Sequence, residues 1–236
     1  MVLLNTVYIA LQAQESKISF KHLSWKEGLS QSPIFSIMQD KVGFIWIGSR
    51  NGLTRYDGYE FKVYHNTELN RSTSQTDINS IYEDDASNLW LATSGGLYQF
   101  VRSNEKFVKI GIPGVKFTSS LYPAGDNRVW ITTDQGIKLL DCKTTRVTDF
   151  ISHKQSGLFV HTLCKGKEDI LWSSSVKGLR CFGASDGRPL PLPQSLNDQL
   201  NKPVKRIFSI QEDADGDIWI GTESSGLFWY KRDTRE

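Results

Sequence analysis

Residues 34–57 read IFSIMQDKVGFIWIGSRNGLTRYD, and residues 207–230 read IFSIQEDADGDIWIGTESSGLFWY. Both stretches pass from a short aliphatic segment, through a turn rich in Asp and Gly, to a segment centred on tryptophan. Three further copies lie between them. The central residues are Trp46, Trp90, Trp130, Trp172 and Trp219, spaced by 44, 40, 42 and 47 residues. Self-similarity at this period is the mark of a repeat protein.

The five copies agree at defined distances from the tryptophan. A hydroxyl residue stands ten positions before it and another three positions after it, and a small residue stands two positions after it. Glycine follows six residues after Trp in four copies and seven after it in the last. The first hydroxyl column is Ser36, Ser80, Ser120, Thr162 and Ser209. Because every copy has these hydroxyls, we expect them to bond backbone groups rather than to catalyse.

Each copy predicts a four-stranded antiparallel meander of about 43 residues. Aspartate together with glycine or asparagine marks the first turn at 40–43, 84–88 and 213–216, and the later glycine marks a second tight turn. Fourth strands are expected at 59–64 and 106–110, with a weaker one at 146–150. The fold class is therefore all-β, a β-propeller of four-stranded antiparallel blades with about five repeats present. The tryptophans are expected to interlock neighbouring blades.

Composition argues against several other classes of protein. Twenty-eight basic residues face 26 acidic ones, giving a net charge of +2, which is unlike a dedicated nucleic-acid-binding protein. No apolar run approaches the roughly 20 residues of a membrane-spanning helix. The sequence contains no hydrolase, phosphate-loop or dinucleotide motif and no spacing typical of metal ligands, so we expect no catalytic residues, metal or cofactor. Cys142, Cys164 and Cys181 are expected to be buried free thiols, with a single bridge as the alternative.

The first residues form a separate segment. Residues 2–11 are uncharged and largely apolar, no charge occurs before Glu15, and Ala10 and Ala13 have the spacing of a secretory cleavage site. We expect residues 1–13 to be a signal peptide with a shortened basic region and residues 14–236 to be the propeller. The alternative is a first strand or a buried segment.

Residues 20–31, 43–48 and 51–61 resemble the start of the periplasmic sensor region of Bacteroides-type hybrid two-component systems, and the copies resemble the two-component regulator propeller repeat. The resemblance covers residues 18–236. It is close in the first, second and fifth copies. In the third and fourth copies, Ala124 and Gly166 replace the turn aspartate, and Ser173 replaces the aliphatic residue after Trp172.

The resemblance implies the recognition end of a receptor whose histidine kinase lies outside this sequence. It implies a periplasmic location, an oligosaccharide ligand derived from glycans, contact with the rest of the receptor chain and with a second protomer, and no direct contact with nucleic acid. Members carry seven-bladed propellers, so the chain is expected to be an N-terminal part of one. The alternative is a closed five-bladed ring, with residues 18–23 as the outer strand of the last blade.

The loops between the second and third strands differ most among the copies and predict a recognition surface on one rim. The candidate ligand-binding residues are Arg50, Asn51, Asp134, Gln135, Lys177 and Glu223. A cleft between two propellers is the alternative location. A propeller enzyme acting on glycans and a protein-binding scaffold remain alternative functions, since propellers support many activities.

Overall fold

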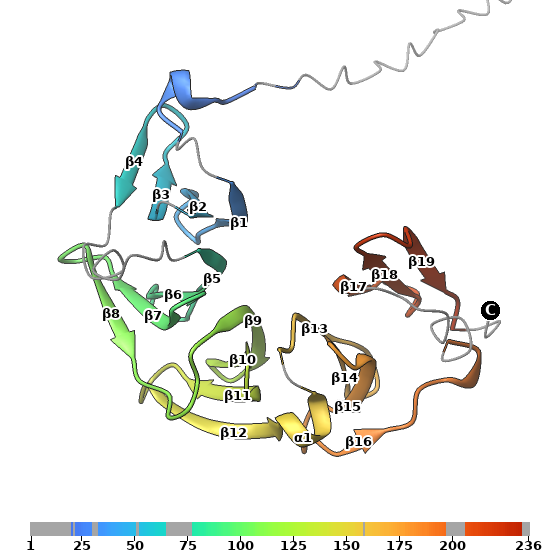
Figure 1. The fold of residues 1–236 in the computed structure, drawn as a ribbon. Helices are drawn as coiled ribbons and strands as arrows, with labels where there is room; N and C mark the ends of the chain where they lie inside the picture. The colour runs from blue at the N-terminus through green and yellow to red at the C-terminus, as the bar shows by residue number, and fades with distance from the viewer. Residues whose placement is uncertain are drawn as a thin grey trace, which may run out of the picture.

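The computed structural model describes residues 20, 22–29, 33–50, 52–64, 77–157, 159–196 and 206–232. Its strands form five antiparallel sheets, each built from consecutive strands, and the sheets follow one another around an axis (Figure 1). The first strand of each sheet lies on the inner side and the fourth on the outer side. The fold is the predicted all-β propeller, and each sheet is one blade.

The blade boundaries follow the repeat. Blade one contains β1 (Ile34–Gln39), β2 (Ile45–Ser49), β3 (Gly52–Tyr56) and β4 (Phe61–Tyr64), and blade two contains β5 (Ile78–Glu83), β6 (Leu89–Thr93), β7 (Gly96–Val101) and β8 (Lys106–Ile110). Blade three contains β9 (Thr118–Gly125), β10 (Arg128–Thr133), β11 (Gly136–Asp141) and β12 (Arg146–Ser152). Blade four contains β13 (Thr162–Lys165), β14 (Ile170–Ser175), β15 (Gly178–Gly183) and β16 (Pro189–Leu190), and blade five contains β17 (Ile207–Glu212), β18 (Ile218–Thr222) and β19 (Leu227–Tyr230).

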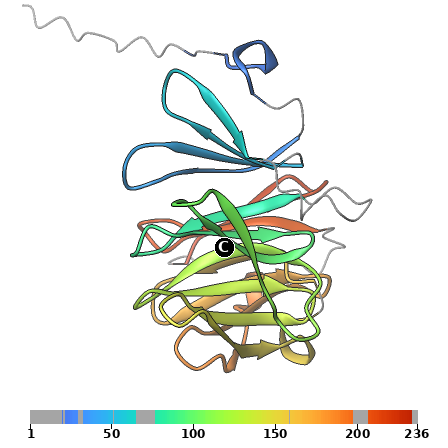
Figure 2. The ribbon, with the colours of Figure 1, turned by 90° about the vertical axis from the view of Figure 1, so that its left-hand side faces the viewer.

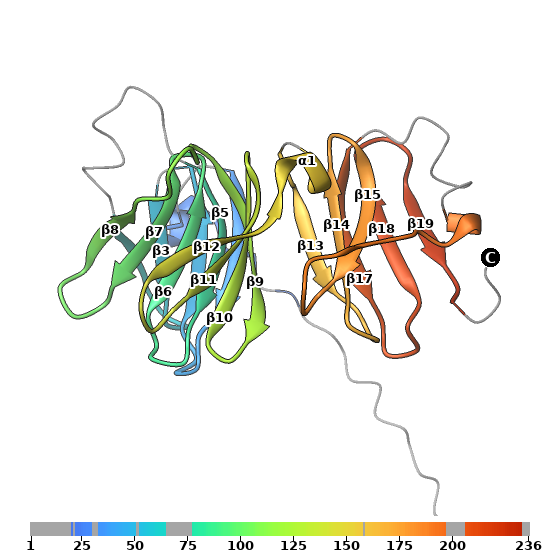
Figure 3. The same cartoon turned by 90° about the horizontal axis from the view of Figure 1, so that it is seen from below.

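The outer strands differ most from the sequence prediction. The strand expected to be weak, β12, has seven residues and pairs along β11, whereas β16 has two. The described sheet of blade five has three strands. Two short helices, η1 (Trp25–Glu27) and α1 (His153–Ser156), accompany the blades, and Figure 3 shows α1 at one end of the strands. A Cβ atom at Gly28, just after η1, would lie 3.6 Å from Phe61, so this segment packs on blade one and not on blade five.

The core lies between the blades, which are stacked face to face (Figure 2). Trp46 and Tyr64 of blade one pack against Ile78, Leu89 and Phe100 of blade two. We call the face that carries the repeat tryptophan the trailing face of a blade, because the next blade covers it. A small residue two positions after Trp lets the blades approach each other closely, since a Cβ atom at Gly48 would lie 2.8 Å from the Ile78 carbonyl oxygen.

A side chain of each blade also bonds one particular carbonyl group of the next. The residue twelve positions before each tryptophan of blades two to five offers its carbonyl oxygen to the preceding blade. The four bonds are Ser36 Oγ to Ile78 O (3.2 Å), Asn79 Nδ2 to Thr118 O (2.9 Å), Ser119 Oγ to Val160 O (2.6 Å) and Ser174 Oγ to Ile207 O (3.1 Å). We call these the carbonyl bonds of the seams. They satisfy backbone groups that the ladders leave unpaired.

The first turn of the blade has two forms. In blades one, two and five an aspartate caps the turn, as predicted. One oxygen of Asp40 accepts the backbone N–H groups of Val42, Gly43 and Phe44, and the other accepts Trp46 Nε1 at 2.7 Å. The bond from the carboxylate to the indole recurs in blades two and five, at 2.9 and 2.8 Å. The turn aspartate therefore also fixes the tryptophan.

Blades three and four, which lack that aspartate, have two-residue turns instead. Asp126 and Asn127 of blade three, and Glu168 and Asp169 of blade four, all have φ between 52° and 59°. Two consecutive left-handed residues are the signature of the tight hairpin turn that matches strand twist. Ala124 and Gly166 thus mark a change of turn type within an intact blade.

Candidate functional site: the rim and the axis

The predicted rim exists as a set of backbone contacts. The loop between the second and third strands bonds the residue that leads into the first strand of the same blade. Ser94 N donates to Asp77 O, Asp134 N to Phe117 O and Glu223 N to Arg206 O, at 2.9 to 3.3 Å. The rim therefore brings the variable loops and the segments leading to the inner strands together at one end of the propeller.

Arg50 is held by blade two. Its Nε donates to Asp77 Oδ1 at 3.0 Å, and its guanidinium lies 5.9 Å from the centre of the Phe35 ring. Both partners of the ion pair are partly exposed, so the pair contributes about 0–1 kcal/mol. Arg50 joins two blades on the rim. Asn51 lies outside the described residues.

Asp134 is mostly occupied by its own blade. The side chain is 9% exposed, and Oδ1 accepts the backbone N–H groups of Lys116 and Phe117 at 3.3 and 3.5 Å. The Gln135 backbone N–H donates to Thr133 Oγ1 at 2.9 Å, and the residue is half-buried. The loop of blade three is therefore ordered by internal bonds.

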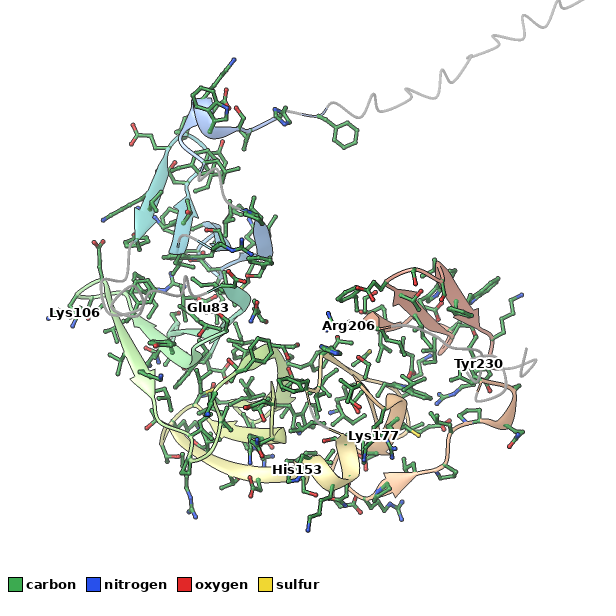
Figure 4. All side chains as sticks on the ribbon, viewed as in Figure 1. Glu83, Lys106, His153, Lys177, Arg206 and Tyr230 are labelled. Atoms are coloured by element: carbon green, nitrogen blue, oxygen red, sulfur yellow. The ribbon has the colours of Figure 1, made fainter. Side chains whose placement is uncertain are left out.

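Lys177 and Glu223 are exposed. Lys177 lies beside the chain that follows α1, because its Cγ would be 3.4 Å from a Cβ atom at Gly157. Glu223 lies beside Arg206, because its backbone N–H donates to the Arg206 carbonyl oxygen. Figure 4 shows Lys177 well apart from Arg206, so these predicted residues line a rim without converging on one point.

Sequence reasoning missed the strongest polar cluster, which lies between blades one and two. Arg102 donates to Asp40 Oδ2 at 2.7 Å and to Glu83 Oε1 at 2.9 Å, and its guanidinium lies 5.2 Å from the centre of the Trp46 ring. Burial alone would raise the pKa of Asp40, but the hydrogen bonds from Trp46 and Arg102 outweigh burial and lower it. The sequence signal for this cluster is Asp40, the aspartate six residues before Trp46. The cluster stabilises the seam between the blades.

One further feature, a cavity, offers little chemistry. A cavity of about 990 Å³ lies between blades four and five, lined by Trp172, Leu190, Tyr230 and Arg232 among others. In the seam between blades one and two, the equivalent place is filled by Phe107 of the fourth strand, β8. Its ring centre lies 5.1 Å from that of Phe100. The described sheet of blade five has three strands, and the described residues place no such ring there.

The cysteine prediction is confirmed, since Cys142, Cys164 and Cys181 are buried and unpaired. In the described part of the chain, no three His, Cys, Asp or Glu side chains come together as ligands for a metal ion. Among the described helices, none is long and apolar enough to cross a membrane.

Comparisons with known proteins agree with the repeat. The family model "two component regulator propeller" matches residues 28–51, 72–95 and 201–224. The first 24-residue match contains Trp46, the second contains Trp90 and the third contains Trp219, in the three blades with the aspartate turn. A histidine kinase of Formosa agariphila is 45% identical over 65 residues, which are 28% of this chain and 5% of that protein.

Solved structures extend the likeness to the whole propeller. The extracellular domain of a hybrid two-component system of B. thetaiotaomicron superposes with a TM-score of 0.73 at 25% identity. The match covers 92% of this chain and 31% of that domain, so the chain spans about a third of it. A virginiamycin B lyase of Staphylococcus aureus has a TM-score of 0.65 at 17% identity, covering 87% of this chain and 69% of the lyase. That second likeness is one of fold.

Proposed function

Three segments of the chain match the two-component regulator propeller repeat, and on that premise we propose that the chain is the extracytoplasmic ligand-recognition propeller of a hybrid two-component receptor. The observation that carries the proposal is the match to the extracellular domain of such a system over 92% of this chain. We propose that residues 1–13 direct export, that residues 14–236 are the periplasmic propeller, and that the kinase lies further along a longer receptor chain.

The trailing face of blade five supports a longer propeller. Trp229 and Leu227 on this face are 45% and 65% exposed, and Trp219 is half-buried, whereas Trp46, Trp90, Trp130 and Trp172 are at most 2% exposed. A further blade covers such a face in each preceding seam. We therefore propose that the receptor continues toward seven blades and signals through a second protomer. The downstream reading frame tests this: a continuing frame should encode two more copies of the repeat.

We propose that the ligand is an oligosaccharide derived from a glycan and that the domain binds it without converting it. The rim residues Arg50, Asn51, Asp134, Gln135, Lys177 and Glu223 are the proposed contacts. Arg50, Lys177 and Glu223 are the exposed ones among those described. A receptor needs different affinities for the ligand in its two signalling states, and it needs no reacting pair of side chains.

The experiment uses the full-length receptor in a host that carries a transcription reporter, challenged with oligosaccharide mixtures. Lys177→Glu should weaken the response while the receptor stays folded. Arg50→Glu alone also breaks the bond to Asp77, so the Arg50→Glu, Asp77→Arg exchange, which keeps an ion pair, is the matched control. A response restored by the exchange makes the role of Arg50 structural. A reporter silent to every glycan mixture, or release of new products by the purified chain, would contradict the proposal.

A further inference from the structure

The residue eleven positions before each tryptophan lies at the inner edge of its blade. In blades one, two and five the pairing of the first two strands skips Phe35, Asn79 and Phe208. Blade three has the same irregularity at Ser119 and Ser120. These are β-bulges, which turn a side chain out of the ladder and recur next to functional sites. The fold therefore places one such residue per blade at the inner edge, and these residues differ: Phe35, Asn79, Ser119, His161 and Phe208. Asn79 and Ser119 bond the next blade.

The residues two positions earlier lead into the inner strands at the rim and are equally varied. Blades three to five carry Phe117, Phe159 and Arg206 there. The rings of Phe117 and Phe159 meet edge to face, 6.5 Å between centres, and Phe159 is 47% exposed with a left-handed φ of 51°. Strained backbone of this kind persists where the surrounding structure holds it and clusters at ligand sites.

Arg206 supplies a positive charge at this place. Figure 4 shows it on the inner side of blade five, opposite the outer edge where Tyr230 lies. Arg50 on the same rim is paired with Asp77, but Arg206 forms no ion pair with any described residue, and it is exposed. Glu223 is its neighbour through the backbone only.

His161 lies next to blade five, because its backbone N–H donates to Ser174 O at 2.8 Å and Ser174 Oγ donates to Ile207 O at 3.1 Å. Burial lowers the pKa of His161 and the Arg206 guanidinium lowers it further, so the imidazole is neutral at pH 7. Its Nε2 is buried and has no hydrogen-bond partner among the described residues. Phe208, two residues after Arg206, is 55% exposed. Blades four and five thus bring a free cation, a neutral polar nitrogen and exposed aromatic rings to one end of the axis.

We propose that this mouth of the axis, formed by Phe159, His161, Arg206 and Phe208, binds an acidic sugar unit. The apolar face of the ring stacks on Phe208 or Phe159, Arg206 pairs with the carboxylate or sulfate group, and His161 Nε2 hydrogen-bonds a ring substituent. Guanidinium groups suit both anions because their planar fork matches the two oxygens. This inference rests on the proposed function and names the ligand class for it.

The test is calorimetric titration of the purified chain with trigalacturonate, its methyl ester and galactose 6-sulfate. Trigalacturonate should bind, and its uncharged ester should bind about tenfold or more weakly, as expected when a charge-assisted bond is lost. Arg206→Ala should weaken trigalacturonate to the level of the ester, and Phe208→Ala should weaken both sugars. Arg188→Ala is the matched control, since Arg188 is an exposed arginine elsewhere in blade four. Binding of galactose 6-sulfate instead of trigalacturonate would identify sulfate as the anion.

The outcomes separate this inference from the proposed function. No bond joins the Arg206 side chain to another described residue, and its backbone bond to Glu223 survives truncation, so Arg206→Ala should keep the melting temperature of the parent chain. Equal affinity of the ester and the acid, unchanged affinity in Arg206→Ala, or no binding of either anionic sugar overturns the acidic-sugar site. A receptor that still responds to neutral oligosaccharides in the reporter assay would keep the proposed function in each of those cases.

Discussion

Glu212 of blade five accepts the indole proton of Trp172 in blade four, with 3.2 Å between Oε2 and Nε1. In blades one, two and five the turn aspartate of the same blade makes this bond. Blade four has Gly166 at that position, and the carboxylate comes from the neighbouring blade instead. The other oxygen of Glu212 accepts Lys167 N at 2.7 Å, as Glu83 accepts Lys41 N in the first seam. Trp130 of blade three, where Ala124 replaces the aspartate, has a buried Nε1 with no partner in the described structure.

Gly166→Asp should destabilise the chain although it restores the repeat consensus. A Cβ atom at Gly166 would lie 2.0 Å from Glu212 Oε2 and 2.8 Å from Trp172 Nε1. We expect a loss of about 1–3 kcal/mol in the free energy of unfolding, as for other overpacked sites. In a Glu212→Ala background the same substitution should cost less or stabilise, because the new aspartate can take the indole proton. Urea titrations of the four variants measure this coupling, and strictly additive losses would contradict it.

Arg102→Ala should be among the most damaging substitutions of a polar residue. The carboxylates of Asp40 and Glu83 are at most 6% exposed and would lose their common cation. Removing one partner of a buried pair costs about 3 kcal/mol. Arg102→Lys should recover only part of this, because an ammonium group cannot reproduce the fork that spans two carboxylates. Arg188→Ala, which breaks an exposed pair, should change the free energy of unfolding by less than about 1 kcal/mol. Equal losses in Arg102→Ala and Arg188→Ala would refute the buried role.

The pKa of Asp40, lowered in the folded chain, makes part of the stability depend on pH. The contribution is complete above the ordinary aspartate pKa of about 3.9 and is lost as the pH falls through the lower pKa of the folded state. Asp40→Asn should therefore melt well below the parent chain at neutral pH, and the difference should shrink in the acid range. Melting temperatures followed down to about pH 3 test this. Asp126→Asn, which breaks an exposed ion pair, is the control and should melt close to the parent chain at neutral pH.

The thiols should be inert in the folded chain. Burial raises the pKa of Cys142 to about 12 and that of Cys181 to about 11, and burial also raises the pKa of Cys164. Thiolate is the reactive form, so a disulfide reagent at pH 8 should label none of the three cysteines until denaturant is added. Rapid labelling of any of them without denaturant would show that its blade opens to solvent.

The sequence predicted the blades because the information for them is local. Trp46, Gly48 and Gly52 all fall within one stretch of seven residues. The positive φ of 128° at Gly52 confirms the second turn. The outer strands were harder to predict, since Arg146–Ser152 alternates weakly and pairs mainly because β11 offers an edge. The hydrogen bond that Trp172 donates to Glu212 joins residues 40 positions apart in two blades. No single repeat can encode such a contact.

The candidate site was predicted only in part. Variable polar loops pointed to one rim, but variability could not indicate which side chains are used by the fold. Asp134 is taken up by two backbone N–H groups, and Arg50 by Asp77. Arg206, which forms no ion pair with the residues that the structure describes, was missed because it precedes the repeat core and has no counterpart column of charge. Accessibility at the rim depends on contacts between segments that are distant in the sequence.

The carbonyl bonds of the seams bear on how such a protein can be rearranged. Each seam has the same acceptor position but a different donor: Ser36, Asn79, Ser119 or Ser174. Because the acceptor is a backbone carbonyl group at the same place in every blade, a donor does not depend on the side chains of the blade that follows it. A blade moved elsewhere in the ring would therefore meet the carbonyl group that its donor needs. These bonds leave the order of the blades open, and they favour recombination by whole repeats that each keep their own donor.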